Sequence, residues 1–162
     1  MIERYAVVTA RIRRELTSIE RIVERAERAL VAARHRPEDQ DLYLDSAALN
    51  LHDFYSGLER IFRHIAATLD QSVPSGLEWH RELLRQMNIA LPEIRPQVVS
   101  EETVRIIDEY LRFRHVVQNV YAFEFDPARI EHLVQRLRPS FEQVKTELLA
   151  FADFLEKLAQ EE

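Results

Sequence analysis

Apolar side chains recur every three or four residues from position 2 to about position 34, which is the spacing of one face of an α-helix. The opposite face is rich in Arg and Glu, and Pro37 follows this segment as a helix breaker. The pattern predicts a long amphipathic helix that ends before Pro37. Its apolar stripe is formed by Ile2, Tyr5, Ala6, Ile12, Leu16, Ile19, Ile22, Val23, Ala26 and Leu30.

A second apolar stripe predicts another long helix over about residues 38–69. One glycine, Gly57, lies inside it. Glycine destabilises a helix interior by about 1 kcal/mol relative to alanine, so its presence indicates that another helix approaches closely there. Residues 70–76 predict a loop, and a short helix follows over residues 77–89. The second stripe comprises Leu42, Leu49, Phe54, Leu58, Ile61, Phe62, Ile65 and Leu69.

The second half of the chain contains two marked helix starts. Two prolines predict an extended segment at residues 91–99, because proline and the residue before it resist the helical conformation. Ser100 is a favourable N-cap with acidic residues behind it, and Asp126 followed by proline repeats the start signal. The last helix is expected to run to the C-terminus, kinked or restarted at Pro139.

These elements predict an all-α fold, an antiparallel bundle of about five helices with long N- and C-terminal helices, in a single domain over residues 1–162. The composition agrees with helices, since 46% of the residues are hydrophobic, 31% are charged and only two are glycine. The chain has no cysteine, which excludes disulfides, thiolate catalysis and thiolate metal sites.

The distribution of charge narrows the expected location and partners. The N-terminal segment carries charges where a signal peptide needs an apolar run, and no stretch resembles a membrane span. We therefore expect a cytoplasmic protein without membrane contact. The net charge of −6 argues against a broad surface that coats nucleic acid, but it leaves room for a local basic cleft that holds one or two phosphates.

The most distinctive segment is the octet Arg-His-Val-Val-Gln-Asn-Val-Tyr at residues 114–121. On a helical wheel of about 100° per residue, Gln118 and Tyr121 fall within about 40° of Arg114. His115 and Asn119 lie together at roughly 100–140°, and the three valines occupy the opposite arc. The octet therefore predicts a helix with one apolar face and one face that carries a cation, an imidazole, two amides and a phenol.

Polar groups of this variety suit a phosphodiester site. Metal-free RNA cleavage needs a base for the 2′-hydroxyl proton, an acid for the leaving oxygen and a cation for the charge on the phosphorane. Arg114 suits the third role, because guanidinium is always charged and can bind phosphate through two donors. His115 suits a proton-transfer role, because imidazoles titrate near neutrality. The alternative interpretation of the octet is a merely solvated helix face.

The remaining candidate chemistry is weaker. No histidine lies in a Glu-x-x-His or His-Glu-x-x-His motif, so we expect neither a metal nor a cofactor. Arg60, Arg63 and His64 form a basic cluster on the second helix. Either Arg60 and Arg63 extend the cleft toward the RNA backbone as substrate-binding residues, or the cluster is a salt-bridged surface.

The octet resembles the Arg-x(4–6)-His-x-Tyr signature of HepT-like toxins, a branch of the HEPN superfamily of helical ribonucleases. Residues 51–67, 73–76 and 79–84 are similar to the body of one HepT-like subfamily, and residues 121–126 also follow its pattern. The order and spacing of these segments extend the resemblance over about residues 42–137.

The resemblance implies a homodimer whose two motif helices line a shared basic cleft, an RNA substrate, endoribonuclease activity, and a minimal nucleotidyltransferase as antitoxin partner. In this interpretation Arg114 binds and stabilises the phosphate, His115 is the acid or base, and Gln118 and Asn119 hold the substrate. Tyr121 matches the motif tyrosine, to which such a transferase can attach AMP. The added phosphate charge beside Arg114 would then exclude RNA.

The chain departs from the family pattern at Asn119, which stands where the pattern has its histidine, two residues before the tyrosine. Asparagine cannot transfer a proton at ordinary pH, and loss of such a group typically costs about 10²–10⁴ in rate. His115, one helical turn earlier, could substitute. Three functions stay open: a toxin endoribonuclease, a catalytically degenerate partner or substrate-presenting subunit of a nucleotidyltransferase, and a plain structural bundle.

Overall fold

The computed structural model describes residues 2–161, and these residues form an all-α fold. Five α-helices carry the architecture, with a turn of 3-10 helix at Pro37–Asp39, a π-helical turn at Ala66–Asp70 and a second 3-10 turn at Ala122–Glu124. The α-helices are α1 (Ile2–His35), α2 (Gln40–Ile65), α3 (Trp79–Met87), α4 (Glu101–Asn119) and α5 (Pro127–Glu161). The predicted fold class, with long first and last helices, is therefore confirmed.

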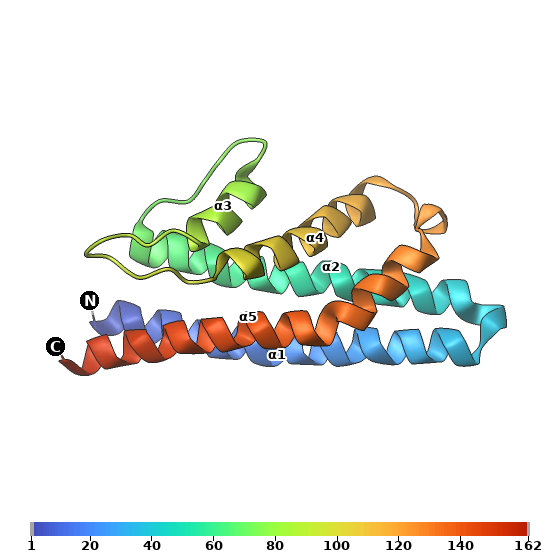
Figure 1. The fold of residues 1–162 in the computed structure, drawn as a ribbon, viewed down its shortest axis with the longest axis horizontal. Helices are drawn as coiled ribbons and strands as arrows, with labels where there is room; N and C mark the ends of the chain where they lie inside the picture. Colours follow the sequence, from blue (N-terminus) through green and yellow to red (C-terminus); the bar gives the residue numbers. More distant parts are fainter. Residues whose placement is uncertain (1, 162) are drawn as a thin grey trace.

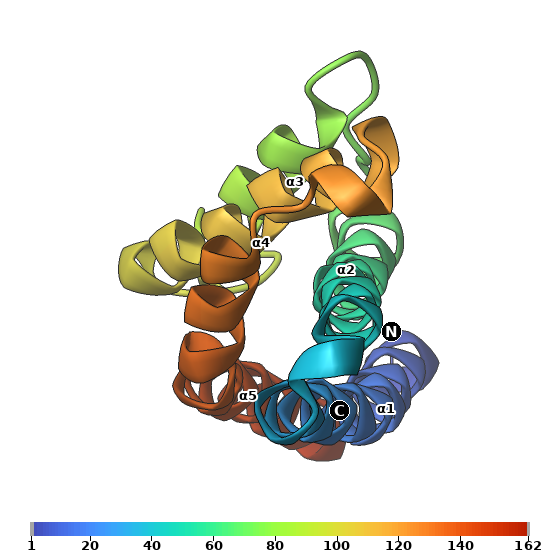
Figure 2. The same ribbon diagram turned by 90° about the vertical axis from the view of Figure 1, so that its right-hand side faces the viewer.

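The three longest helices lie side by side and form the base of the molecule (Figure 1). Helix α1 runs antiparallel to both α2 and α5, and the two chain ends lie at the same end of the bundle (Figure 1). Helices α3 and α4 pack on α2, on the side away from α1, as the end-on view shows (Figure 2). This second layer carries the polar octet.

One cluster of buried apolar side chains, drawn from all five α-helices, forms the core. Phe54 of α2 makes edge-on contacts with Tyr110 of α4 (ring centroids 5.0 Å apart) and Phe141 of α5 (6.4 Å), so one aromatic side chain joins three helices. The Tyr110 hydroxyl donates to the carbonyl of Leu133 at 3.0 Å. Burial raises the pKa of Tyr110 to about 12, so this phenol stays a neutral donor.

The predicted apolar stripes are wrong at four positions, where the side chains are exposed: Ile2, Ala6, Leu42 and Leu49. In α2 the core positions are Leu44, Ala47 and Leu51, which continue into Phe54 at helical spacing. Ala47 and Ala48 are fully buried in the core, and the sequence pattern did not distinguish them from surface alanines. Leu49, 57% exposed, consequently falls outside the stripe.

The predicted start of α4 is confirmed and is reinforced from another helix. The Ser100 hydroxyl accepts the backbone N–H of Thr103 at 3.2 Å, as an N-cap does. The carboxylate of Glu147 in α5 accepts the Ser100 N–H at 2.6 Å and the Thr103 hydroxyl at 2.6 Å. This anion at the positive end of the α4 dipole fixes the direction in which α4 leaves the extended segment.

The C-terminal helix continues through Pro139 without a restart. Its first turns rise away from α1 toward the end of α4, and the helix then bends to run along α1 (Figure 1). Proline removes one hydrogen bond of the helix ladder. Near Pro139, the Ser140 hydroxyl donates to the carbonyl of Arg136 at 2.7 Å.

None of the helices within residues 2–161 combines the length and the apolar character that a membrane crossing requires.

The close helix approach predicted at Gly57 is confirmed. A Cβ atom at this position would lie 2.8 Å from Cγ1 of Ile19, a fully buried side chain of α1. We expect Gly57→Ala to lower the free energy of unfolding by up to about 2 kcal/mol, because overpacking costs about 1–3 kcal/mol and helix propensity returns roughly 1 kcal/mol of it. Urea denaturation measures the change.

The effect of Gly57→Ala on stability should depend on Ile19, the side chain that the added Cβ atom would meet. In an Ile19→Ala background the obstructing side chain is absent, so adding Gly57→Ala should be neutral or stabilising. An equal loss of stability in both backgrounds would show that something other than this contact requires glycine.

Candidate functional site

The prediction that the whole octet is helical is wrong at its end. Helix α4 stops at Asn119, and Val120 is extended, with φ −128° and ψ 159°. The Asn119 side-chain amide donates to the carbonyl of His115 at 2.6 Å, a local contact that occupies the last turn of the helix. Tyr121 therefore leaves the helix and does not share a helical face with Arg114.

Arg114 and Gln118 lie together, as the helical wheel predicted, and they face α2. The Arg114 Nη1 donates to Gln118 Oε1 at 3.2 Å, and its Nε lies 3.4 Å from the Ser56 hydroxyl. The Gln118 amide lies 3.5 Å from Nε2 of His52. Sequence analysis did not connect His52 and Ser56 with the octet, although they are four residues apart on one face of α2.

Arg114 is half-buried and its charge is not neutralised locally. Within residues 2–161 no carboxylate lies within ion-pair distance of its guanidinium. Its fixed contacts are the neutral hydroxyl of Ser56 and the neutral amide of Gln118. A guanidinium held in this way is oriented and remains able to bind an anion.

His115 and Asn119 face a different direction, into a pocket of about 710 Å³ between α3 and α4, which we call the α3–α4 pocket. Most of its lining comes from these two helices, with one side chain from α5. The octet thus contributes to two adjacent surfaces of α4. The pocket is lined by Leu77, Glu78, His80, Arg81, Leu111, Arg112, His115, Val116, Asn119, Val120 and Arg129.

The α3–α4 pocket is cationic. Arg81 and Arg112 both approach the carboxylate of Asp108, at 3.5 Å and 2.7 Å. Arg129 of α5 lies over the ring of Phe113, 5.5 Å from its centroid, and has no carboxylate partner in the described part of the chain. Three arginines therefore line the pocket with His115, against two carboxylates, that of Asp108 and that of Glu78 in the lining. This local excess of positive charge suits a phosphate in spite of the negative net charge of the chain.

A second histidine enters the same pocket from α3. Nδ1 of His80 lies 2.6 Å from Oε2 of Glu59, a buried carboxylate on α2. The Trp79 ring lies against the imidazole, with centroids 3.6 Å apart. Nothing in the sequence connects positions 59 and 80, which are 21 residues apart.

Tyr55 lies beneath α4 and takes no part in an exposed site. Its side chain is fully buried, and its hydroxyl makes no hydrogen bond within the described residues. Burial, reinforced by the nearby carboxylate of Glu59, raises the pKa of Tyr55 far above its usual value. Tyr55 is therefore a neutral phenol of the core rather than a candidate base.

Tyr121 is the exposed end of the octet. Its side chain is 71% exposed and stacks on the exposed ring of Phe123, with centroids 5.4 Å apart and planes at 8°. The pair lies in the turn between α4 and α5. Flat exposed aromatic pairs can stack on nucleobases, so this turn is chemically compatible with single-stranded RNA.

The basic cluster of Arg60, Arg63 and His64 lies away from the octet. Arg60 is 3.6 Å from Glu15 of α1, and Arg63 lies over the Trp79 ring at 5.0 Å from its centroid. All three line a hollow of about 370 Å³ between α1 and α2. Burial, together with the charge of Arg11, lowers the pKa of His64. Among residues 2–161 they make no hydrogen bond or ion pair with α4, and their predicted role in substrate binding stays a prediction.

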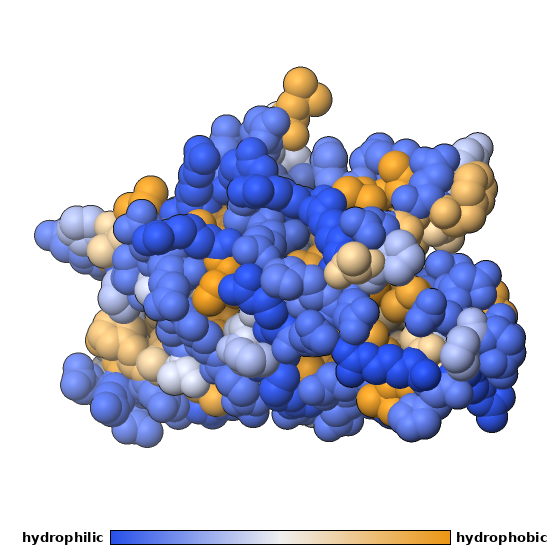
Figure 3. Space-filling model, turned by 45° about the vertical axis from the view of Figure 1, so that its right-hand side comes forward, coloured by the Kyte–Doolittle hydropathy of each residue, from blue (hydrophilic) through white to orange (hydrophobic). Residues whose placement is uncertain are grey.

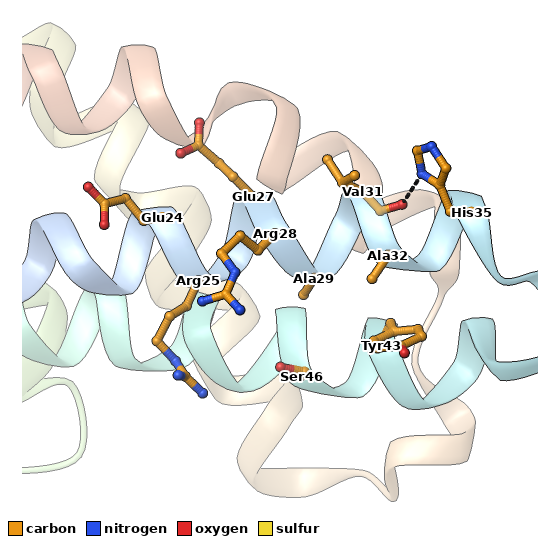
Figure 4. A pocket seen from close by; sticks show the side chains of 10 residues that line it. All are labelled: Glu24, Arg25, Glu27, Arg28, Ala29, Val31, Ala32, His35, Tyr43 and Ser46. Carbon is orange, nitrogen blue, oxygen red and sulfur yellow. Dashed lines mark hydrogen bonds between the residues drawn. The ribbon is translucent and has the colours of Figure 1, made fainter.

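A larger hollow, of about 910 Å³, lies at the far end of the α1–α2 hairpin (Figure 4). Its side chains point in different directions, and the His35 ring donates to the carbonyl of its own turn, that of Val31, at 2.9 Å (Figure 4). It contains no residue of the octet. The face of the molecule drawn in Figure 3 is mostly hydrophilic, with small scattered apolar patches. The α3–α4 pocket and the adjoining Arg114 surface are therefore the candidate site.

Comparison with known proteins gives one match. Residues 46–155 match the family model described as HepT-like protein, which is more than half of the chain. A search of curated proteins and a search of solved structures gave no match. The matched stretch includes α3, α4, the whole octet and every residue of the α3–α4 pocket.

Proposed function

The chain belongs to the HepT-like family, and from this premise we propose that it is a metal-independent RNA endoribonuclease, the toxin of a pair whose antitoxin is a minimal nucleotidyltransferase. The observation that carries the proposal is the arrangement on α4. Arg114 is oriented by Ser56 and Gln118, and the next residue, His115, opens into a pocket with three arginines. An RNA strand that crosses α4 would meet both surfaces.

The chemistry follows from these positions. The ribose 2′-oxygen forms a bond to phosphorus, and the bond from phosphorus to the 5′-oxygen of the next nucleotide breaks. A base takes the 2′-hydroxyl proton and an acid protonates the leaving oxygen. His115 supplies one of these two transfers, and the guanidinium of Arg114 offsets the charge of the phosphorane. Gln118 and Asn119 position the strand through their amides.

The experiment is incubation of the purified chain with tRNA or mRNA in the presence of EDTA. We expect fragments whose 3′ ends carry 2′,3′-cyclic phosphates, because the 2′-oxygen is the nucleophile. RNA that stays intact under these conditions and also with divalent ions present would contradict the proposed activity.

The second candidate is a non-catalytic partner or substrate-presenting subunit of a nucleotidyltransferase. The presence of Asn119 at the position of the motif histidine favours it. It predicts tight co-purification with the transferase and no cleavage of RNA. The active form proposed under either candidate is a homodimer in which two copies of α4 face each other.

The proposal includes modification of Tyr121 by the transferase. The phenolic oxygen would attack the α-phosphorus of ATP, pyrophosphate would leave, and the transferase would accept the phenolic proton. Tyr121 is accessible for this reaction, whereas three of the five tyrosines, Tyr5, Tyr55 and Tyr110, are buried. The added charge beside α4 would repel the RNA backbone.

We expect mass spectrometry of the chain, co-expressed with its transferase, to show AMP on Tyr121. The variant Tyr121→Phe should lose the modification and keep the fold, because the side chain is exposed. Tyr43→Phe is the matched control, since Tyr43 is only partly buried and lies on α2. Unchanged labelling of Tyr121→Phe would place the modification elsewhere.

A further inference from the structure

The contact between His80 and Glu59 is unusual for a purely structural ion pair. The Glu59 side chain is only 9% exposed, and within residues 2–161 its one ion-pair partner is an imidazole rather than an arginine or lysine. A buried carboxylate needs a hydrogen-bond donor. Here Nδ1 of His80 is that donor, at 2.6 Å. The carboxylate therefore selects the ring nitrogen that carries the proton.

This arrangement leaves the second ring nitrogen of His80 for the α3–α4 pocket. The carboxylate occupies Nδ1, and the Trp79 ring limits rotation of the imidazole from one side. The His80 side chain is 20% exposed and lines the pocket together with His115. A carboxylate that orients an imidazole toward a reacting group is a recurrent device for proton transfer.

We propose that the α3–α4 pocket binds an RNA phosphodiester and that His80 is the second proton-transfer residue, in the role left open by Asn119. Glu59 is its positioning residue, and Arg112 and Arg129 bind the phosphate. This inference rests on the proposed ribonuclease function and adds a residue from α3, outside the octet, to its site.

The two histidines divide the reaction between them. One neutral imidazole accepts the 2′-hydroxyl proton as the 2′-oxygen bonds to phosphorus. The other, protonated, donates its proton to the 5′-oxygen as that bond to phosphorus breaks. The cyclic phosphate leaves as the product, and proton exchange with water returns both histidines to their starting states. No oxidant, metal or other co-reactant besides water enters the balance.

The rate is expected to follow a bell-shaped pH profile, since one imidazole must be neutral and the other protonated. The charged and titratable groups that face His80 come from four helices and the turn before α3. They are Glu59 from α2, Glu78 and Arg81 beside His80, Arg112 and His115 from α4, and Arg129 from α5. Glu59 accepts the Nδ1 proton of His80.

The test is cleavage of an RNA oligonucleotide by the full chain and its variants across pH. We expect His80→Gln to lower the rate by about 10²–10⁴-fold. Glu59→Gln should lower it by about 10-fold or more and displace one limb of the pH profile, which a purely structural contact would not do. His132→Gln is the matched control, because His132 lies on the exposed surface of α5 outside the pocket. This variant should leave the cleavage rate and the pH profile unchanged.

Chemical rescue distinguishes chemistry from folding. In His80→Ala, added imidazole is expected to restore part of the lost rate, whereas it cannot restore a lost fold. Two results would overturn the inference while the proposed function stands. In the first, the native chain cuts RNA and His80→Gln cuts it equally well. In the second, the activity of the variants falls only in parallel with their melting temperature, and imidazole gives no rescue. If the native chain leaves RNA intact, both fail.

Discussion

Asp70→Asn is expected to destabilise the protein by about 3–5 kcal/mol, the loss that follows removal of one partner of a buried ion pair. The Asp70 carboxylate accepts Nε and Nη2 of Arg95 at 2.6 and 2.8 Å, and both side chains are almost completely buried. Arg95 also donates to the carbonyls of Ile89, Pro96 and Gln86. Without the carboxylate, a guanidinium charge stays buried without its counter-ion.

Urea denaturation followed by circular dichroism measures this loss. The matched control is Glu101→Gln, which removes one partner of the exposed pair with Arg105 and should change stability by less than about 0.5 kcal/mol. In the double variant Asp70→Leu/Arg95→Met, much of the loss should be recovered, because no unpaired charge remains. A loss of less than 1 kcal/mol in Asp70→Asn would show that water reaches Arg95.

Arg114→Ala is expected to lower kcat/KM for RNA cleavage by about 10²–10³-fold, the usual effect of removing one group that stabilises charge in the transition state. The side chain is half-buried, oriented by Ser56 and Gln118, and free of carboxylate partners within residues 2–161. Arg114→Lys should retain part of the rate, since lysine keeps the charge but lacks the two-donor geometry of guanidinium.

The control for this prediction lies on the same helix. Arg105→Ala removes an exposed arginine from the other end of α4, so it reduces the positive charge of the chain equally and should leave the rate unchanged. If Arg114→Ala cleaves RNA at the native rate, the octet takes no part in the reaction. Equal losses in Arg105→Ala and Arg114→Ala would instead indicate a general electrostatic effect on RNA binding.

The local elements could be predicted because their causes are local. Helix periodicity, the Ser100 cap and the Asp126 start depend on residues within one or two turns, and each is present: the Asp126 carboxylate accepts the N–H of Ala128 at 3.0 Å. The requirement for Gly57 could also be predicted, because glycine destabilises a helix interior and its presence inside an apolar stripe indicates a close contact with another helix. The register of the stripe failed at Leu42 and Leu49, which are exposed, whereas Ala47 and Ala48 are buried in the core.

Contacts between distant segments could not be predicted in the same way. Glu59 and His80 are 21 residues apart, and Glu147 binds the N-cap residue Ser100, 47 residues earlier. Each pair meets only because two helices pack at a particular angle, and many other pairings of charged residues fit the same composition. The octet shows both cases: the neighbours Arg114 and Gln118 were predicted by helical spacing, whereas the exit of Tyr121 from the helix was not.

Patterns repeated every three or four residues are enough to predict the all-α class, the order of the helices and the polar segment that carries the candidate chemistry. Only the packing of the helices divides the polar side chains of α4 between two surfaces and brings His80 and Glu59 to one of them. The difference comes from burial. A carboxylate such as Glu59 acquires a specific partner only when the packing of α2, α3 and α4 excludes water from it.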